Sequence, residues 1–179
     1  MIIFYLKVFI IMIISIHQPN YAPWGGYFYK LLMSDLFIFL DDAQYSKNSF
    51  INRTKVCLDK KYTWLTIPVN YKLGDRINNV RVAQMDWKDR HLSKIKNFYG
   101  NSAYFSENWY DVKCLFQSLN ENSLSSINKK IIFFWSLSDQ APDAAVKNVI
   151  EKALKICDAA GMNIVYSEPM LTCSLYKIF

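Results

Sequence analysis

The feature that most constrains the fold is a pair of short apolar runs separated by a Pro- and Gly-rich loop and a helical segment. Residues 13–16 read as a buried strand, and residues 36–40 are a continuous apolar run of strand length with acidic residues on both sides. Between them, residues 26–33 carry the apolar face of a helix. The order strand, helix, strand predicts two parallel strands whose carboxyl ends meet at one sheet edge.

The rest of the chain supplies further elements of both kinds. Residues 55–58 and 62–69 predict a β-hairpin, and short strands are expected at residues 77–82 and 164–166. Four more helices are expected, the first of them capped by Asp86 and ended by Gly100, at residues 87–99, 109–119, 123–134 and 144–160. We therefore expect an α/β fold: a Rossmann-like, mostly parallel sheet flanked by helices, with an added β-hairpin.

The chain is long enough for one domain with a real core, which we place at residues 12–179. Residues 1–11 are strongly apolar and too short to span a bilayer, so no stable membrane span is expected. From Met12 onward the sequence reads as an ordinary first strand. We therefore expect residues 1–11 to be an N-terminal appendage or a mis-assigned gene start.

Composition narrows the class of partner. A net charge of +6 suits an anionic ligand, but the basic residues are dispersed and no nucleic-acid-binding motif is present, so no nucleic acid is expected. The four cysteines, at positions 57, 114, 157 and 173, lie too far apart in sequence for a metal clip or a redox pair. They predict reduced thiols in a cytoplasmic protein, with no metal and no cofactor. Walker A, GxGxxG, GxSxG and HExxH motifs are all absent.

Three residues at the predicted sheet edge are candidates for catalysis: His17, Asp41 and Asp42. His17 follows the first strand, and the two aspartates follow the second. A histidine titrates near neutrality and can act as a general base, although a structural histidine bonded to a loop carbonyl is the alternative. Each aspartate either orients substrate or caps a turn.

The same two loops are rich in amide, aromatic and basic side chains, which are typical of sites that hold a polar ligand such as a sugar. Arg53 suits phosphate or carboxylate, or else a surface ion pair. His91 lies on the apolar face of the helix at residues 87–99, where it either faces the cleft or is a satisfied core histidine. The candidate substrate-binding residues are Gln18, Asn20, Tyr21, Trp24, Tyr27, Lys30, Gln44, Lys47, Asn52, Arg53 and His91.

Four multi-residue blocks follow one another along the sequence. They are Ile-His-Gln-Pro-Asn-Tyr at 16–21 with Pro-Trp at 23–24, Phe-Ile-Phe-Leu-Asp-Asp at 37–42 with Asn-Arg at 52–53, Trp-Leu-Thr-Ile-Pro-Val at 64–69, and Trp87 with His91 and Tyr99. These four blocks resemble the WbqC-like family of bacterial surface-polysaccharide clusters. Together they cover roughly residues 12–105. After residue 166 the sequence departs from the family's pattern, so we expect a chain that is short at its C-terminus.

The resemblance implies a role in O-antigen, capsule or lipopolysaccharide biosynthesis. It suggests a transferase that places an aminoacyl or acyl group on an amino sugar, with a nucleotide-linked amino sugar as one partner and an acyl carrier protein or other thioester as donor. In that reading His17 is the base, and Arg53 and Lys47 hold phosphates. Two alternatives remain: a non-catalytic sugar-binding or scaffold subunit, and a nucleotidyltransferase, which the missing second histidine of its motif disfavours.

Overall fold

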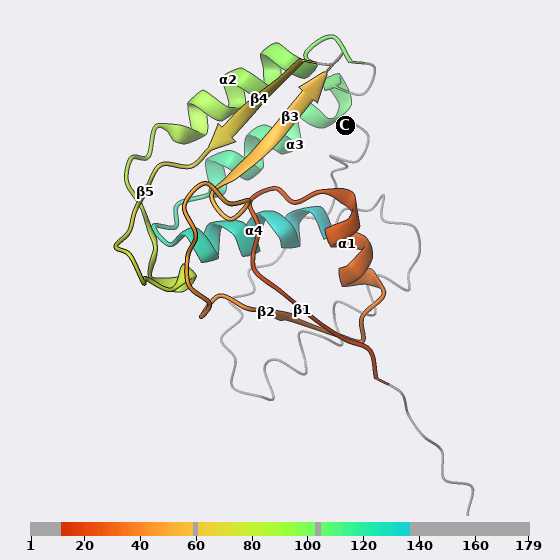
Figure 1. The fold of residues 1–179 in the computed structure, drawn as a ribbon. Helices are drawn as coiled ribbons and strands as arrows, with labels where there is room; N and C mark the ends of the chain where they lie inside the picture. The colour runs from red at the N-terminus through yellow and green to blue at the C-terminus, as the bar shows by residue number, and fades with distance from the viewer. Residues whose placement is uncertain (1–11, 59–60, 103–104, 137–179) are drawn as a thin grey trace, which may run out of the picture.

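The computed structural model describes residues 12–58, 61–102 and 105–136, and it shows a mixed fold of helices and small sheets (Figure 1). The helices are α1 (Gly25–Leu32), α2 (Trp87–Tyr99), α3 (Phe105–Ser118) and α4 (Leu124–Ser136), with a short 3-10 helix η1 (Ile77–Asn79). The strands are β1 (Ile14–His17), β2 (Leu36–Phe39), β3 (Arg53–Leu58), β4 (Lys61–Thr66), β5 (Val69–Asn70) and β6 (Arg81–Val82). The α/β class is confirmed.

Strands β1 and β2 pair in parallel, as their sequence pattern predicts. His17 is in register with Phe39, and the Leu40 amide donates to the His17 carbonyl at 2.9 Å. The loops after the two strands therefore start at the same edge. The larger, Rossmann-like sheet that we expected is not found among the described residues, where each sheet has two strands. The expected helix at residues 144–160 and strand at 164–166 lie outside the described residues.

One face of the β1–β2 pair packs on the core and the other is open. Phe37 is buried against Tyr27, with ring centroids 5.5 Å apart. Ile13, Ile14 and Ile16, which we expected to be buried, are 51%, 47% and 51% exposed. The expectation was wrong at these three positions because it assumed that both faces of the parallel pair would be covered.

The hairpin β3–β4 and α2 form where the sequence predicts them, but β4 ends at Thr66 and Val69 belongs to the separate strand β5. Two further local expectations are corrected. Residues 77–82 do not form one strand, because Ile77 and Val80 are both fully buried and a three-residue spacing suits the 3-10 turn of η1. Asp86 precedes α2 without capping it through its side chain; its carboxylate instead lies 3.1 Å from Arg90.

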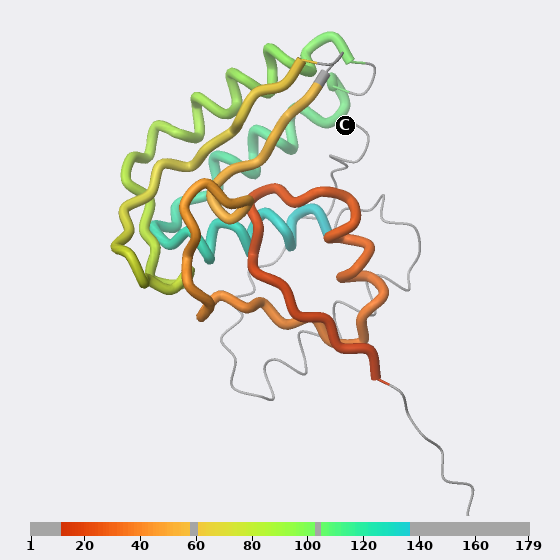
Figure 2. Tube along the Cα trace, viewed as in Figure 1, coloured from red at the N-terminus to blue at the C-terminus, as the bar shows by residue number. Residues whose placement is uncertain are grey.

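Helix α4 lies between the two halves of the described structure (Figure 1). On one side are β1 and β2, and on the other are the hairpin β3–β4 with α2 and α3. The tube in Figure 2 shows that the loop after β1, called the first loop below, passes over α4 between these two halves; the loop after β2 is called the second loop. The core residues Leu124, Ile127 and Ile132 of α4 are fully buried. Among the described residues, no helix has the length and apolar character needed to cross a membrane.

Candidate functional site

His17 ends β1 at the edge where the two parallel strands finish. Its Nδ1 lies 2.9 Å from the carbonyl oxygen of Gln18. Because a carbonyl only accepts, Nδ1 carries the hydrogen and Nε2 keeps its lone pair. Within the described part of the chain Nε2 has no hydrogen-bond partner, and the side chain is only partly buried. The geometry therefore leaves one basic nitrogen available at the sheet edge.

Tyr27 of α1 packs against the His17 ring. The two rings meet edge to face with centroids 4.7 Å apart, and the Tyr27 hydroxyl donates to the Gln18 carbonyl at 3.1 Å. The Tyr27 ring is buried, and burial raises its pKa. Lys30 extends along the surface of α1, where Nζ donates to the Ile16 carbonyl at 3.3 Å. Tyr27 and Lys30 thus hold the end of β1, while Gln18 contributes its backbone.

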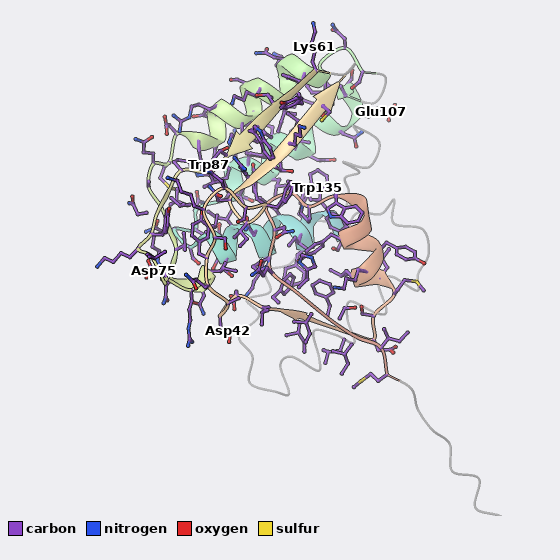
Figure 3. The ribbon with its side chains drawn as sticks, viewed as in Figure 1. Asp42, Lys61, Asp75, Trp87, Glu107 and Trp135 are labelled. Atoms are coloured by element: carbon purple, nitrogen blue, oxygen red, sulfur yellow. The ribbon has the colours of Figure 1, made fainter. Side chains whose placement is uncertain are left out.

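Asp41, just past β2, is engaged by α4. Its Oδ2 accepts from Ser125 Oγ at 2.6 Å and from Lys129 Nζ at 2.7 Å. Burial acts to raise the pKa of Asp41, but the hydrogen bonds from Lys129 and Ser125 and the lysine charge outweigh it and hold that pKa below its usual value. Asp41 is therefore an ionised anchor for the second loop. Asp42 is exposed, with no side-chain partner in the described residues (Figure 3).

Tyr21 and His91 form a buried pair that joins the first loop to α2 and β4. His91 Nε2 lies 3.1 Å from the Thr66 carbonyl, so Nε2 carries the hydrogen and Nδ1 accepts from the Tyr21 hydroxyl at 2.7 Å. Burial lowers the pKa of His91 to about 4, which keeps the ring neutral. The structure places this histidine, 3% exposed, in the core rather than in an open cleft.

Asn128 of α4 ties the two loops together, and sequence reasoning missed it. Its Nδ2 donates to the Pro19 carbonyl at 2.8 Å and to the Ile51 carbonyl at 2.7 Å. With Ser125 and Lys129 it forms a polar stripe at i, i+3 and i+4 along α4, and that spacing was the signal available in the sequence.

The remaining second-loop candidates divide between core and surface. Asn52 is buried, and its Nδ2 donates to the Ile67 carbonyl at 3.1 Å. The Arg53 guanidinium lies 4.3 Å from the centroid of the Trp64 ring, and its Nε is buried without a hydrogen-bond partner in the described residues. Gln44 and Lys47 are exposed.

In the first loop, Asn20 is partly buried and Trp24 is 73% exposed. Trp24 lies at the start of α1 with its ring against Gly26, where a Cβ atom would collide with it. The loop that follows His17 therefore presents a large exposed aromatic ring.

Taken together, the described residues offer a partly buried histidine, His17, at the end of β1, and an exposed carboxylate, Asp42, on a loop that α4 anchors through Asp41. No contact joins His17, Asp41 and Arg53 among the described residues, so the three are not one hydrogen-bonded constellation. The described residues hold no group of three or more His, Cys, Asp or Glu side chains suited to a metal ion.

Comparison with known proteins gives the family. The WbqC-like protein family matches this sequence over residues 18–170. The chain is also 29% identical over 121 residues to the "Uncharacterized protein Rv1507c" of Mycobacterium tuberculosis (strain ATCC 25618 / H37Rv), an alignment that covers 66% of this chain and 52% of that relative. The chain thus spans about half the length of the curated relative that it matches. No solved structure matches. The family match covers most of the chain, and the protein therefore belongs to the WbqC-like protein family.

Proposed function

We propose that the protein is a transferase that places an acyl or aminoacyl group on the amine of a nucleotide-linked amino sugar, in O-antigen, capsule or lipopolysaccharide synthesis in the cytoplasm. The sugar amine attacks the carbonyl carbon of a thioester donor, a C–N bond forms and the C–S bond breaks. His17 Nε2 takes the proton that the amine loses and returns it to the departing thiolate.

The observation that carries the proposal is the state of His17. Its Nδ1–H is held by the Gln18 carbonyl, and that contact fixes both the tautomer and the ring orientation. Nε2 is thereby left as an acceptor at the carboxyl end of a parallel strand, where ligands of α/β proteins commonly bind. The Gln18 carbonyl does for His17 what a carboxylate often does for a catalytic histidine, so Asp41, which is engaged by Lys129, is not needed as its orienting group.

The nucleotide end of the substrate is assigned to the second loop. Arg53 Nε, which has no hydrogen-bond partner among the described residues, is a buried donor that a phosphate oxygen would satisfy, and the exposed Lys47 supplies a second positive charge. In this proposal Asp42, which is exposed, accepts hydrogen bonds from sugar hydroxyls or from the amine. In this assignment Asp41 keeps the loop in position and touches no substrate.

The test begins with a thermal-shift screen of the full chain against nucleotide-linked amino sugars and acyl-coenzyme A thioesters, because a ligand of the native state raises Tm by mass action. Turnover is then measured as thiol release. His17→Gln should lower kcat by about 10²-fold or more while leaving sugar-nucleotide binding in place. Glu107→Gln, an exposed change on α3, is the matched control and should behave as wild type. Unchanged turnover in His17→Gln would remove the base from the proposal.

A non-catalytic sugar-binding subunit is the second candidate, and the exposure of Trp24 favours it. A flat, exposed ring beside a polar loop is suited to stacking on a sugar face. This candidate predicts sugar binding that Trp24→Ala weakens, with no turnover of any thioester. Thiol release that depends on His17 would reject it.

A further inference from the structure

A cavity of about 320 Å³ lies beside the outer edge of β3, apart from His17 and the acidic residues. The loop before α1, the first turn of α1, β3 and the ends of α2 and α4 enclose it. Trp135, labelled in Figure 3, belongs to the last turn of α4. The full set of lining residues is Ala22, Pro23, Trp24, Gly25, Phe28, Thr54, Lys55, Cys57, Tyr99 and Trp135. Its volume is at the lower end of the range for small-molecule sites.

The walls of the cavity are chemically apolar, although some of them carry hydroxyl groups. The Tyr99 hydroxyl donates to the Cys57 carbonyl and accepts from the Cys57 amide, both at 3.0 Å. The Thr54 hydroxyl donates to the Ala22 carbonyl at 3.1 Å. Because both hydroxyls are used within the protein, the walls favour an apolar group over a polar one.

Lys55 is the charged residue among the residues that line the cavity. It is exposed, and its Nζ lies 3.6 Å from the centroid of the Tyr62 ring on the solvent side of the hairpin. A cation at the rim of an apolar cavity favours a ligand with one anionic end that stays near water. The cavity and Lys55 together therefore select an amphipathic molecule.

The loop that closes the cavity is held in a costly conformation. Ala22 has φ of +40°, in a region that residues with a Cβ rarely adopt. The loop is tied down by the Thr54 hydroxyl and by a hydrogen bond of 2.9 Å from the Tyr21 amide to the Phe50 carbonyl. Backbone strain of this kind clusters at ligand sites, where surrounding contacts maintain it. The exposed ring of Trp24 borders the same cavity. A ligand that covered this ring would remove apolar surface from water, which favours binding.

We propose that this cavity binds a small apolar chain or ring that carries a single anionic end, with the apolar part between Trp24, Phe28 and Trp135 and the anion beside Lys55. This binding does not depend on the transferase proposed above, because no lining residue except Trp24 belongs to the candidate sugar site.

The test uses Cys57, which is exposed and borders the cavity, as a reporter in the full-length protein. The alkylation rate by N-ethylmaleimide is followed peptide by peptide, with Cys114 of α3 as an internal control. Hexanoate and 3-phenylpropionate should slow alkylation of Cys57 by about fivefold or more at saturation and leave Cys114 unchanged. Hexanol, which lacks the anion, should need a higher concentration. Equal rates with and without these probes, or equal slowing at both cysteines, would overturn the proposal.

Two variants test which residues contact the anionic end and the apolar part of the ligand. Lys55→Gln should weaken hexanoate binding by about fivefold or more and leave hexanol binding unchanged, whereas Lys113→Gln, at an exposed position on α3, should change neither. Trp24→Ala should weaken both probes. If Lys55→Gln binds hexanoate like wild type, the anion subsite is refuted even if the apolar cavity is occupied.

The experiment also separates the two proposals. In the His17→Gln variant, hexanoate should slow alkylation of Cys57 as it does in wild type, even where turnover is lost. Protection in wild type without any thioester turnover would support the cavity and refute the transferase. Turnover without protection of Cys57 would refute the cavity alone.

Discussion

Stability should depend on pH through His91, which is buried as a neutral ring. Tyr21 donates to its Nδ1, and its Nε2–H donates to the Thr66 carbonyl. Burial is the largest cause that lowers the pKa of His91 to about 4, and the charges of Lys94 and Arg90 act in the same direction. A second proton would go to Nδ1, which already accepts from the Tyr21 hydroxyl, so protonation requires that hydroxyl to turn and accept instead.

The direction and size of this pH dependence follow from the linkage between proton binding and unfolding. The imidazole has a pKa of 6.5 in the unfolded chain and about 4 in the folded chain, so between these values the unfolded chain binds the proton and the folded one does not. The free energy of unfolding therefore falls as pH falls from about 6.5 to about 4, and this group causes no further loss below that. At 1.36 kcal/mol per pKa unit, the full loss is on the order of 3 kcal/mol. Asp41, whose pKa is lowered from 3.8, acts only in more acidic solution.

The assay is urea unfolding at pH 7.5, 6.5, 5.5 and 4.5, compared between wild type and His91→Gln. The variant should be less stable at pH 7.5 but should lose most of the slope between pH 6.5 and 4.5. The chain has two histidines, so NMR should show two imidazole Hε1 signals, and His17→Gln assigns them. A His91 signal that titrates near 6.5, or an equal slope in the variant, would refute a buried neutral His91.

Three further changes test the contacts that hold the loops. Lys129→Met should raise the pKa of Asp41 toward its usual value and cost about 1–2 kcal/mol, since the ion pair is only partly exposed; carbon NMR titration and urea unfolding measure the two effects. Asn128→Leu leaves two loop carbonyls without a donor and should cost about 2–4 kcal/mol in the free energy of unfolding by urea. Tyr99→Phe should cost about 1–3 kcal/mol and speed hydrogen exchange at the Cys57 amide, whereas protection equal to wild type would show that the Tyr99 hydroxyl is not its partner.

Local pattern was sufficient to predict the elements whose signals are short-range. Helix α2 begins at Trp87 and ends at Tyr99, as the sequence indicates, because its apolar spacing and the following Gly100 are both local. The parallel pairing of β1 and β2 was also predictable, since a strand, a helix and a second strand in that order leave few other topologies. The edge that carries His17 and Asp41 followed from that pairing.

Side-chain partners were much less predictable, because they come from residues far apart in the sequence. Tyr21 and His91 are 70 positions apart, and Asp41 and Lys129 are 88 apart. Nothing near either residue of a pair indicates that the other will reach it. The prediction that Ile14 and Ile16 are buried was wrong for a related reason. The sequence of a strand shows that it is apolar but not how many of its faces will be covered.

The loop residues of the family blocks therefore divide by what they touch. Tyr21, Asp41 and His91 are fully engaged within the protein, and altering them would change activity by moving the loops. His17 instead keeps an acceptor nitrogen at the end of β1, and Trp24 keeps an exposed ring in the loop that follows. A loss of activity at the first three would not distinguish an enzyme from a binding protein, because either would lose its loop geometry. Only substitutions at the second kind of residue, in protein whose melting is unchanged, separate a role in chemistry from a role in folding.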